Sequence, residues 1–410
     1  MSETALLTLD RPAYGGTAFG RLQDGRAVFV PFALPGERVC VRLVEQKHKF
    51  VRAELVEILE PAPVRISPKC PHFARCGGCH YQHLLYAEQC QTKAIILRDQ
   101  LERIGKIEDP PVRPMIPAPQ AWNYRNHVQF HLTPDGRLGF HSVNATEVVP
   151  IGECHLPETQ INDLWPQIEF EAGAPFERVS LRSGSDGDLM LILESKTEHP
   201  PDLEVEAGIS VVHLFEEDAV VLAGSKYLTM EILGRPFRLS AGSFFQINTR
   251  MAEEMVRHVQ SLLPQAIETL LDVYCGVGLF SAFLAPRCRR LIGIEVSPLA
   301  CEDFVVNLDA FEHVELYEAA AEFVLPVLAE QITGPVCAVL DPPRAGLEKA
   351  VLDALQALRP ERIVYVSCDP STLARDARRL IAGGYRLREV TPFDLFPQTY
   401  HIESISLFEK

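Results

Sequence analysis

The chain has 410 residues, of which 47% are hydrophobic, and its formal net charge at pH 7 is −16. This length favours two to four domains with cores of their own. The chain has no apolar run long enough to span a membrane and no export signal at its start, so we expect it neither to span a membrane nor to be exported. Its eleven dispersed cysteines favour a reducing cytoplasm. Such an acidic chain is not expected to bind nucleic acid indiscriminately, because indiscriminate binders are usually basic.

Residues 1–60 predict an all-β module, with short apolar strands at 5–9, 27–31, 38–43 and 53–58 separated by glycine-containing turns. The module resembles the TRAM domain, an OB-like barrel that binds RNA. Four neighbouring residues offer contacts to phosphates and to a base: Lys47, Lys49, Phe50 and Arg52. The alternative is a solvated charged loop.

A proline-containing linker leads into a glycine-rich loop that holds Cys70, Cys76 and Cys79, with spacings of five and two intervening residues. Cys154 is a plausible fourth ligand. Four thiolates suit a structural Zn²⁺ or a [4Fe–4S] cluster, and the spacing alone does not separate the two. Cysteines without any ligand are the third alternative.

The segment 86–104 predicts a helix, and 123–235 predicts mostly β structure with turns at 134–136 and 186–187. We therefore expect a central domain over 61–240, with the helix 86–104 packing on the C-terminal domain. No internal repeat or low-complexity tract is present.

Residues 241–410 alternate apolar strands with helix-length segments, as in a doubly wound α/β sheet. The strands are expected at 270–273, 291–294, 314–316, 336–340 and 363–366, followed by an antiparallel pair at 385–390 and 401–408. Gly276 and Gly278 form a Gly-x-Gly turn before a helix, where a nucleotide approaches the backbone. Glu295 ends the next strand, 23 residues after Asp272, and is placed to bind ribose hydroxyls.

Cys368 follows an apolar strand and precedes Pro370, which suits the first turn of a helix. The positive end of the helix dipole should favour its nucleophilic thiolate form. Glu403 shares a strand face with Ile405 and Leu407, and burial there would raise its pKa and make it a base usable near neutrality.

Asp341 ends the fourth strand and is followed by two prolines that stiffen the loop over the pocket. The carboxylate would lie near the methyl-donating end of a cofactor, and Arg344 is available for a phosphate or a carboxylate. A Gly-x-Gly-x-x-Gly pattern, more typical of NAD-binding folds, is absent because Ser281 takes the third position. The parallel strands with a terminal antiparallel pair resemble the class I S-adenosylmethionine-dependent methyltransferase fold, and this resemblance makes S-adenosylmethionine the better prediction.

Five motifs occur in order over the last 170 or so residues: DVYCGVG, GIEVS, LDPPRAG, VSCDPSTLARD and FPQTYHIES. Together they resemble the RNA 5-methyluridine methyltransferase family, which modifies transfer RNA and large-subunit ribosomal RNA. The resemblance implies a class I methyltransferase sheet with an antiparallel last strand. It also implies that Cys368 is the nucleophile and Glu403 the general base. The implied contacts to S-adenosylmethionine come from Gln246, Tyr274, Gly276, Gly278, Glu295 and Asp341.

The resemblance further implies a [4Fe–4S] cluster on Cys70, Cys76, Cys79 and Cys154. The reaction of this family explains why a cysteine nucleophile is needed, because C5 of uracil becomes nucleophilic only after a thiolate adds to C6. Arg125, in a segment that resembles the family's central domain, is a candidate RNA contact. Arg344, Arg375 and His401 are further candidates.

Arg375, Arg378 and Arg379 recur on one helix face, with Arg386 and Arg388 on the next strand, and predict a local basic rim. We therefore expect a folded ribosomal or transfer RNA, recognised by shape and one flipped uridine, and a monomer without an obligate protein partner. Two alternatives stay open. One is methylation of cytosine C5 or adenine N6, and the other is a non-catalytic RNA-binding protein.

Overall fold

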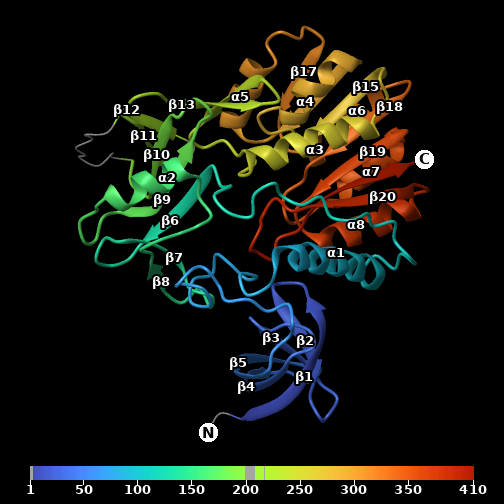
Figure 1. Ribbon diagram of the computed structural model, residues 1–410. Helices are drawn as coiled ribbons and strands as arrows, with labels where there is room; N and C mark the ends of the chain where they lie inside the picture. The colour runs from blue at the N-terminus through green and yellow to red at the C-terminus, as the bar shows by residue number, and fades with distance from the viewer. Residues whose placement is uncertain (1–2, 199–207, 217) are drawn as a thin grey trace.

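The N-terminal part of the chain is a closed five-stranded barrel in the order β1-β2-β3-β5-β4. The computed structural model describes residues 3–198, 208–216 and 218–410. Four predicted strands of the barrel are present, and β2 was missed because glycines flank and interrupt its short sequence. The barrel strands are β1 (Thr4–Ala13), β2 (Thr17–Arg21), β3 (Ala27–Pro31), β4 (Arg38–Gln46) and β5 (Phe50–Glu60). Figure 1 shows the barrel below the rest of the molecule.

The cysteine loop leads into α1 (Tyr86–Arg103), which matches the predicted helix to within one residue. Its buried face, formed by Ile96, Leu97 and Leu101, shares a hydrophobic cluster with Leu340 and Tyr365 of the C-terminal sheet. The helix therefore packs on the C-terminal domain, although it precedes the central domain in sequence. In Figure 1 it lies between the barrel and the C-terminal sheet.

The central domain is built on a seven-stranded sheet in the order β12-β11-β10-β9-β6-β7-β8, the central sheet. Both predicted turns are present, one between β6 and β7 and one between β9 and β10. Its elements are β6 (His127–Leu132), β7 (Leu138–His141), β8 (Val148–Pro150), α2 (Thr159–Leu164), η1 (Trp165–Gln167), β9 (Phe176–Ser183), β10 (Leu189–Ser195), β11 (Ser210–Phe215) and β12 (Asp218–Ala223).

The C-terminal sheet has the order β17-β16-β15-β18-β19-β21-β20, and β21 runs antiparallel to both neighbours. The fold class predicted from the motifs is confirmed. The elements are β13 (Tyr227–Ile232), β14 (Arg235–Ser240), α3 (Thr249–Leu262), β15 (Ile267–Val273), α4 (Leu279–Leu284), η2 (Ala285–Arg287), β16 (Cys288–Glu295), α5 (Pro298–Asn307), β17 (Val314–Glu318), α6 (Ala321–Gln331), β18 (Val336–Leu340), α7 (Lys349–Leu358), β19 (Arg362–Ser367), α8 (Pro370–Ala382), β20 (Arg386–Phe393) and β21 (Glu403–Glu409).

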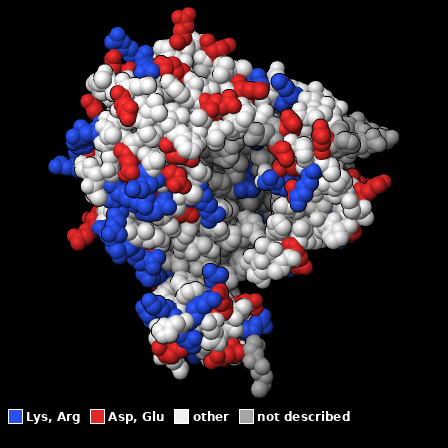
Figure 2. All heavy atoms as spheres, turned by 180° about the vertical axis from the view of Figure 1, so that it is seen from behind, with Lys and Arg blue, Asp and Glu red and all other residues white. Residues whose placement is uncertain are grey.

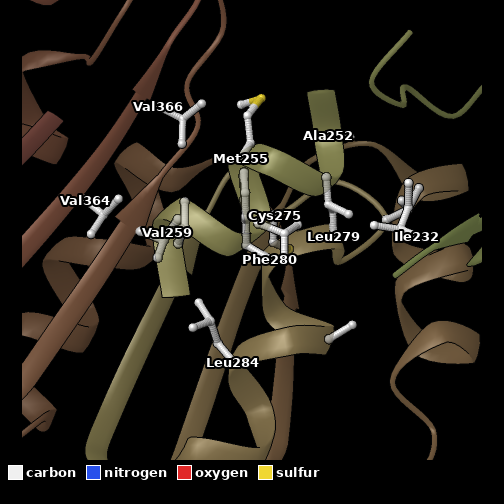
Figure 3. Packing of buried hydrophobic residues seen from close by; sticks show 14 of the residues in the cluster. Ile232, Ala252, Met255, Val259, Cys275, Leu279, Phe280, Leu284, Val364 and Val366 are labelled. Carbon is white, nitrogen blue, oxygen red and sulfur yellow. The ribbon is translucent and has the colours of Figure 1, made fainter. Parts of the chain in front are cut away.

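Helices cover both faces of this sheet, so its inner strands β15, β18, β19 and β21 are buried almost throughout. On one face, Met255 and Val259 of α3 share a core cluster with Val364 and Val366 of β19, as Figure 3 shows. The hairpin of β13 and β14 also contributes to this cluster, through residues such as Ile232. This core packing fixes the positions of the strand ends that carry the candidate site residues. Among the described residues, no helix is both long and apolar enough to cross a membrane.

Candidate active site

Strand register gathers the predicted catalytic residues at one edge of the C-terminal sheet. Ser367 pairs with Ser404 across β19 and β21, so Cys368 and Glu403 are neighbours at the end of that ladder. Leu340 pairs with Val273 of β15 on one side and with Tyr365 of β19 on the other. The residues that follow these strands therefore meet at the same edge, as the carboxyl ends of parallel strands do.

Glu403 is the first residue of β21 and is only 3% exposed. Burial raises its pKa well above the ordinary value for a carboxyl group, and the nearby Asp341 raises it further. The expected buried carboxylate is present. Strand alternation is not what buries it, because helices cover both faces of the sheet here.

Cys368 lies between β19 and α8, as the sequence predicts. The expected thiolate preference is wrong for the chain by itself, since burial raises the pKa of this thiol to about 12. The carboxylates of Glu403, Asp341 and Asp369 raise it further. Desolvation and the three neighbouring carboxyl groups outweigh the helix N-terminus, so positive charge from a ligand would favour the thiolate.

Asp341 follows β18, and its pKa is raised to about 7 by burial, then by Asp272 and Glu295. Asp341 is half-buried, whereas Asp272, the penultimate residue of β15, is fully buried, and its pKa is raised to about 6. We call Asp272, Asp341 and Glu403 the acid cluster. A concentration of buried carboxyl groups at one strand edge favours a cationic ligand, because such a charge stabilises their ionised forms.

The Gly-x-Gly turn after β15 has the backbone expected of a nucleotide-binding loop. Tyr274, Gly276 and Gly278 all adopt left-handed φ angles, of 65°, 54° and 88°. No atom would contact a Cβ at Gly276, so its backbone faces open space. A Cβ at Gly278 would instead overlap with Leu308 and Phe304. The first glycine thus leaves room for a ligand, and the second allows the turn to pack on α5.

The Glu295 carboxylate braces this turn from the next strand. One oxygen accepts a hydrogen bond from the Gly276 N–H at 2.9 Å, and the other accepts from the N–H groups of Val296 and Ser297 at 2.8 Å each. The remaining lone pairs are available for ribose hydroxyls. Gln246 lies in the loop between β14 and α3, and its carbonyl accepts a hydrogen bond from the Asn126 side chain at 3.0 Å.

A cleft of about 1110 Å³ separates the central sheet from the C-terminal domain. One wall carries Arg125, His127 and Ser180, and each has a buried polar atom without a hydrogen-bond partner. The other wall includes Phe244, Tyr400 and His401, and His401 lies two residues before Glu403. Figure 2 shows this hollow between the two upper lobes, with Lys or Arg side chains on its walls. Sequence reasoning placed His127 in the candidate RNA-contacting segment but missed Ser180, because alternation in β9 resembles that of any half-buried strand.

The predicted metal ligands Cys70, Cys76, Cys79 and Cys154 line one end of the same cleft. Burial raises the pKa of all four thiols, and neighbouring thiols raise those of Cys76, Cys79 and Cys154 further. The Gly78 N–H donates to the Cys76 sulfur at 3.4 Å. Nowhere in the described ranges are three or more His, Cys, Asp or Glu residues gathered closely enough to hold a single metal ion.

The side chains predicted to contact RNA differ in their exposure and in whether protein groups already bind them. Arg344 is 58% exposed and lies 3.3 Å from the Asp369 carboxylate. His401 is half-buried, and burial followed by the charge of Arg344 lowers its pKa to about 3, so it is neutral at pH 7. The guanidinium of Arg375 is already bound to Asp376 at 2.8 Å and to the Ala345 carbonyl at 2.9 Å.

The rest of the predicted basic rim is more open. Arg378 and Arg379 are exposed on α8, whereas Arg388 pairs with Glu409 at 2.8 Å. In Figure 2, Lys and Arg side chains gather on the lower flank of the lobe that holds the C-terminal sheet. On the barrel, Lys47 and Arg52 both face Glu45, at 3.1 and 3.6 Å.

Comparison with known proteins assigns the chain to a family. Its residues 220–331 and 335–410 match the model for tRNA (Uracil-5-)-methyltransferase, and residues 3–56 match the TRAM domain. An uncharacterized RNA methyltransferase of Streptomyces avermitilis is 34% identical over 430 residues, covering 100% of this chain and 99% of the relative. The chain belongs to the RNA uracil-C5 methyltransferase family.

A second relative of this methyltransferase, an uncharacterized RNA methyltransferase of Aquifex aeolicus, is 34% identical over 98% of both chains. Among solved structures, the chain resembles Pyrococcus abyssi tRNA (uracil-54, C5)-methyltransferase in complex with S-adenosyl-L-homocysteine. The TM-score is 0.74 and the identity 26%, over 98% of this chain and 100% of that one. The protein is therefore an S-adenosylmethionine-dependent RNA (uracil-C5-)-methyltransferase.

Proposed function

We propose that this methyltransferase modifies C5 of one uridine in a ribosomal or transfer RNA through a covalent bond between Cys368 and C6 of the base. The observation that carries the proposal is the adjacency of Cys368, Glu403 and Asp341 at one strand edge. A thiol and a buried carboxyl group with a raised pKa are the nucleophile and the base that the reaction requires.

When bound, S-adenosylmethionine supplies a methyl group on a positively charged sulfonium. Held beside the acid cluster, that charge would lower the pKa of Cys368 and favour its thiolate. The thiolate would add to C6, and the electron pair would move to C5, which would take the methyl group as S-adenosylhomocysteine leaves. Glu403 then removes the proton from C5, the C5–C6 double bond re-forms, and the Cys368 sulfur leaves as thiolate.

Six residues are proposed to hold S-adenosylmethionine: Gln246, Tyr274, Gly276, Gly278, Glu295 and Asp341. The open backbone at Gly276 admits the nucleoside, and the Glu295 carboxylate accepts from its ribose hydroxyls. Asp341 faces the cationic end. Its raised pKa in the chain alone supports this orientation, because the carboxyl group has no cation of its own.

The cleft is proposed to receive the RNA segment that carries the target uridine. Arg125 has a buried guanidinium nitrogen without a partner there, and His127 and Ser180 each offer an unpaired polar atom. Unstacked bases are read by such hydrogen-bonding groups. Arg344 and His401 would contact the flipped nucleotide, whereas Arg375 supports the loop after Asp341 and touches RNA less directly.

Cys70, Cys76, Cys79 and Cys154 are proposed to hold a [4Fe–4S] cluster, with structural zinc as the alternative. A cube of four irons keeps its thiolates farther apart than a single ion does. The four cysteines line the same cleft, and neighbouring thiols raise the pKa values of Cys76, Cys79 and Cys154, which supports a ligand shared by all four. The resemblance of the cysteine spacing to that of the family favours the cluster over zinc. Iron and sulfide analysis with an absorption spectrum of anaerobically purified protein distinguishes the two. We further propose a monomer in a reducing cytoplasm.

The function is tested by incubating the protein with radiolabelled S-adenosylmethionine and ribosomal or transfer RNA that lacks 5-methyluridine, then mapping the label. We expect label at C5 of a single uridine. Glu403→Gln should stop after methyl transfer and accumulate protein bound to methylated RNA, because the C5 proton stays in place. Label on cytosine or on adenine N6 would refute the proposal and support the alternatives.

A further inference from the structure

Tyr14 is the point at which the N-terminal barrel touches the nucleophile's loop. It lies in the turn between β1 and β2, 355 positions from Asp369 in the chain. Its hydroxyl donates a hydrogen bond of 2.7 Å to one carboxylate oxygen of Asp369, the residue directly after Cys368. Burial and the Asp369 charge raise the pKa of Tyr14, so this hydroxyl stays protonated and remains a donor.

Asp369 is the residue through which such a contact would act. One of its oxygens accepts from the N–H groups of Ser371 and Thr372, at 2.8 and 3.2 Å, and so caps α8. The other oxygen accepts from Tyr14 and from Arg344 Nε. The side chain of Asp369 is 10% exposed, so water cannot easily replace a lost donor.

The turn that carries Tyr14 is held firmly against the site. A Cβ at Gly16 would lie 2.9 Å from His80, so only glycine allows the turn to approach this closely. The ring of Tyr14 packs edge-on against Tyr400 at 5.8 Å between centroids, and Tyr400 also packs against His80 at 4.5 Å. The barrel therefore contacts both segments that carry catalytic groups, one after Cys368 and one before Glu403.

We propose that Tyr14 is a positioning residue for methyl transfer: through Asp369 it fixes the loop that presents the Cys368 sulfur to C6 of the uridine. The inference rests on the proposed role of Cys368. It gives the barrel a role in the chemical step in addition to RNA binding. The donated hydrogen bond also offsets the Asp369 charge, which opposes thiolate formation at Cys368.

The test is Tyr14→Phe, which keeps the ring and removes only the hydroxyl. With RNA lacking 5-methyluridine as substrate, we expect kcat to fall roughly tenfold, the equivalent of one charge-assisted hydrogen bond, while KM for RNA changes less than about twofold. Tyr227→Phe makes the same change at an exposed site on β13 and should leave both constants unaltered. In an Asp369→Asn background, Tyr14→Phe should cause little further loss, because its acceptor is already weakened.

Other outcomes overturn the proposal. An unchanged kcat, a rise in KM alone, or additive losses in the double variant would each show that Tyr14 does not act through Asp369. A lower melting temperature with normal kcat would show a purely structural contact. Cys368→Ser is assayed in parallel: if it stays active, the covalent mechanism has failed, whereas inactivity beside a fully active Tyr14→Phe protein rejects the Tyr14 role alone.

Discussion

Replacing Asp341 by asparagine should stabilise the fold while weakening the enzyme. The pKa of this half-buried carboxyl group rises from 3.8 to about 7 on folding, chiefly through desolvation. A raised pKa means that the unfolded chain loses the proton first, so stability falls as pH rises from about 4 to 7. At about 1.4 kcal/mol per pH unit, ionised Asp341 destabilises the ligand-free fold by roughly 4 kcal/mol at pH 8. Asp341→Asn keeps the shape and removes that charge.

Urea unfolding at pH 4.5 and pH 8 measures this effect. The variant should be more stable than the parent by roughly 2–4 kcal/mol at pH 8, and by much less at pH 4.5, where Asp341 keeps its proton in the fold. Asp163→Asn, at an exposed position on α2, should show no such pH-dependent gain. Equal differences at both pH values would refute the reasoning.

The same substitution should separate the two forms of the cofactor. S-adenosylmethionine carries a sulfonium charge that S-adenosylhomocysteine lacks, so Asp341→Asn should weaken binding of the first by far more than the second. Titration calorimetry at pH 8 measures both affinities. An equal loss for the two ligands would place Asp341 away from the sulfonium and would contradict the proposed orientation.

Three further predictions concern other parts of the molecule. Gly278→Ala should lower stability and S-adenosylmethionine affinity together, because φ is +88° and a Cβ would overlap with side chains at the end of α5, as melting and titration would show. Lys93→Met should reduce the free energy of unfolding by about 3–5 kcal/mol in urea, since it leaves Asp394, 2.6 Å away and fully buried, without its partner. Arg379→Glu should weaken RNA binding more at low salt than at high salt, whereas Arg289→Glu, at the opposite sheet edge, should have little effect in the same filter assay.

The sequence predicted the strand ends of the C-terminal sheet well, because each combines an apolar run with a distinctive next residue. The predicted bounds of β18 match the structure, as do those of β3 in the barrel, and Glu295 ends β16 as expected. Cys368 and Glu403 were identified because linked motifs restrict the chemistry more than any single residue does. Their adjacency then follows from strand order, which α/β alternation largely fixes.

What sequence reasoning missed depends on contacts between distant segments. The raised pKa of Cys368 arises first from burial of the thiol and then from Glu403, Asp341 and Asp369, and together these outweigh the local helix effect that the sequence reveals. Tyr14 reaches Asp369 only because the barrel docks beside α1, and no local pattern encodes that docking. The helical spacing predicted that Arg375 belongs to an exposed basic rim. Its guanidinium is instead bound to Asp376 and to a loop carbonyl.

The most direct test of the account asks which atom of the protein bonds to the base. The protein is incubated with S-adenosylmethionine and substrate RNA containing 5-fluorouridine, whose C5 carries fluorine in place of the proton that Glu403 must remove. The account predicts a stable protein–RNA adduct whose digest carries the nucleotide on the peptide that contains Cys368. An adduct on another residue, or its formation by the Cys368→Ser protein, would contradict it.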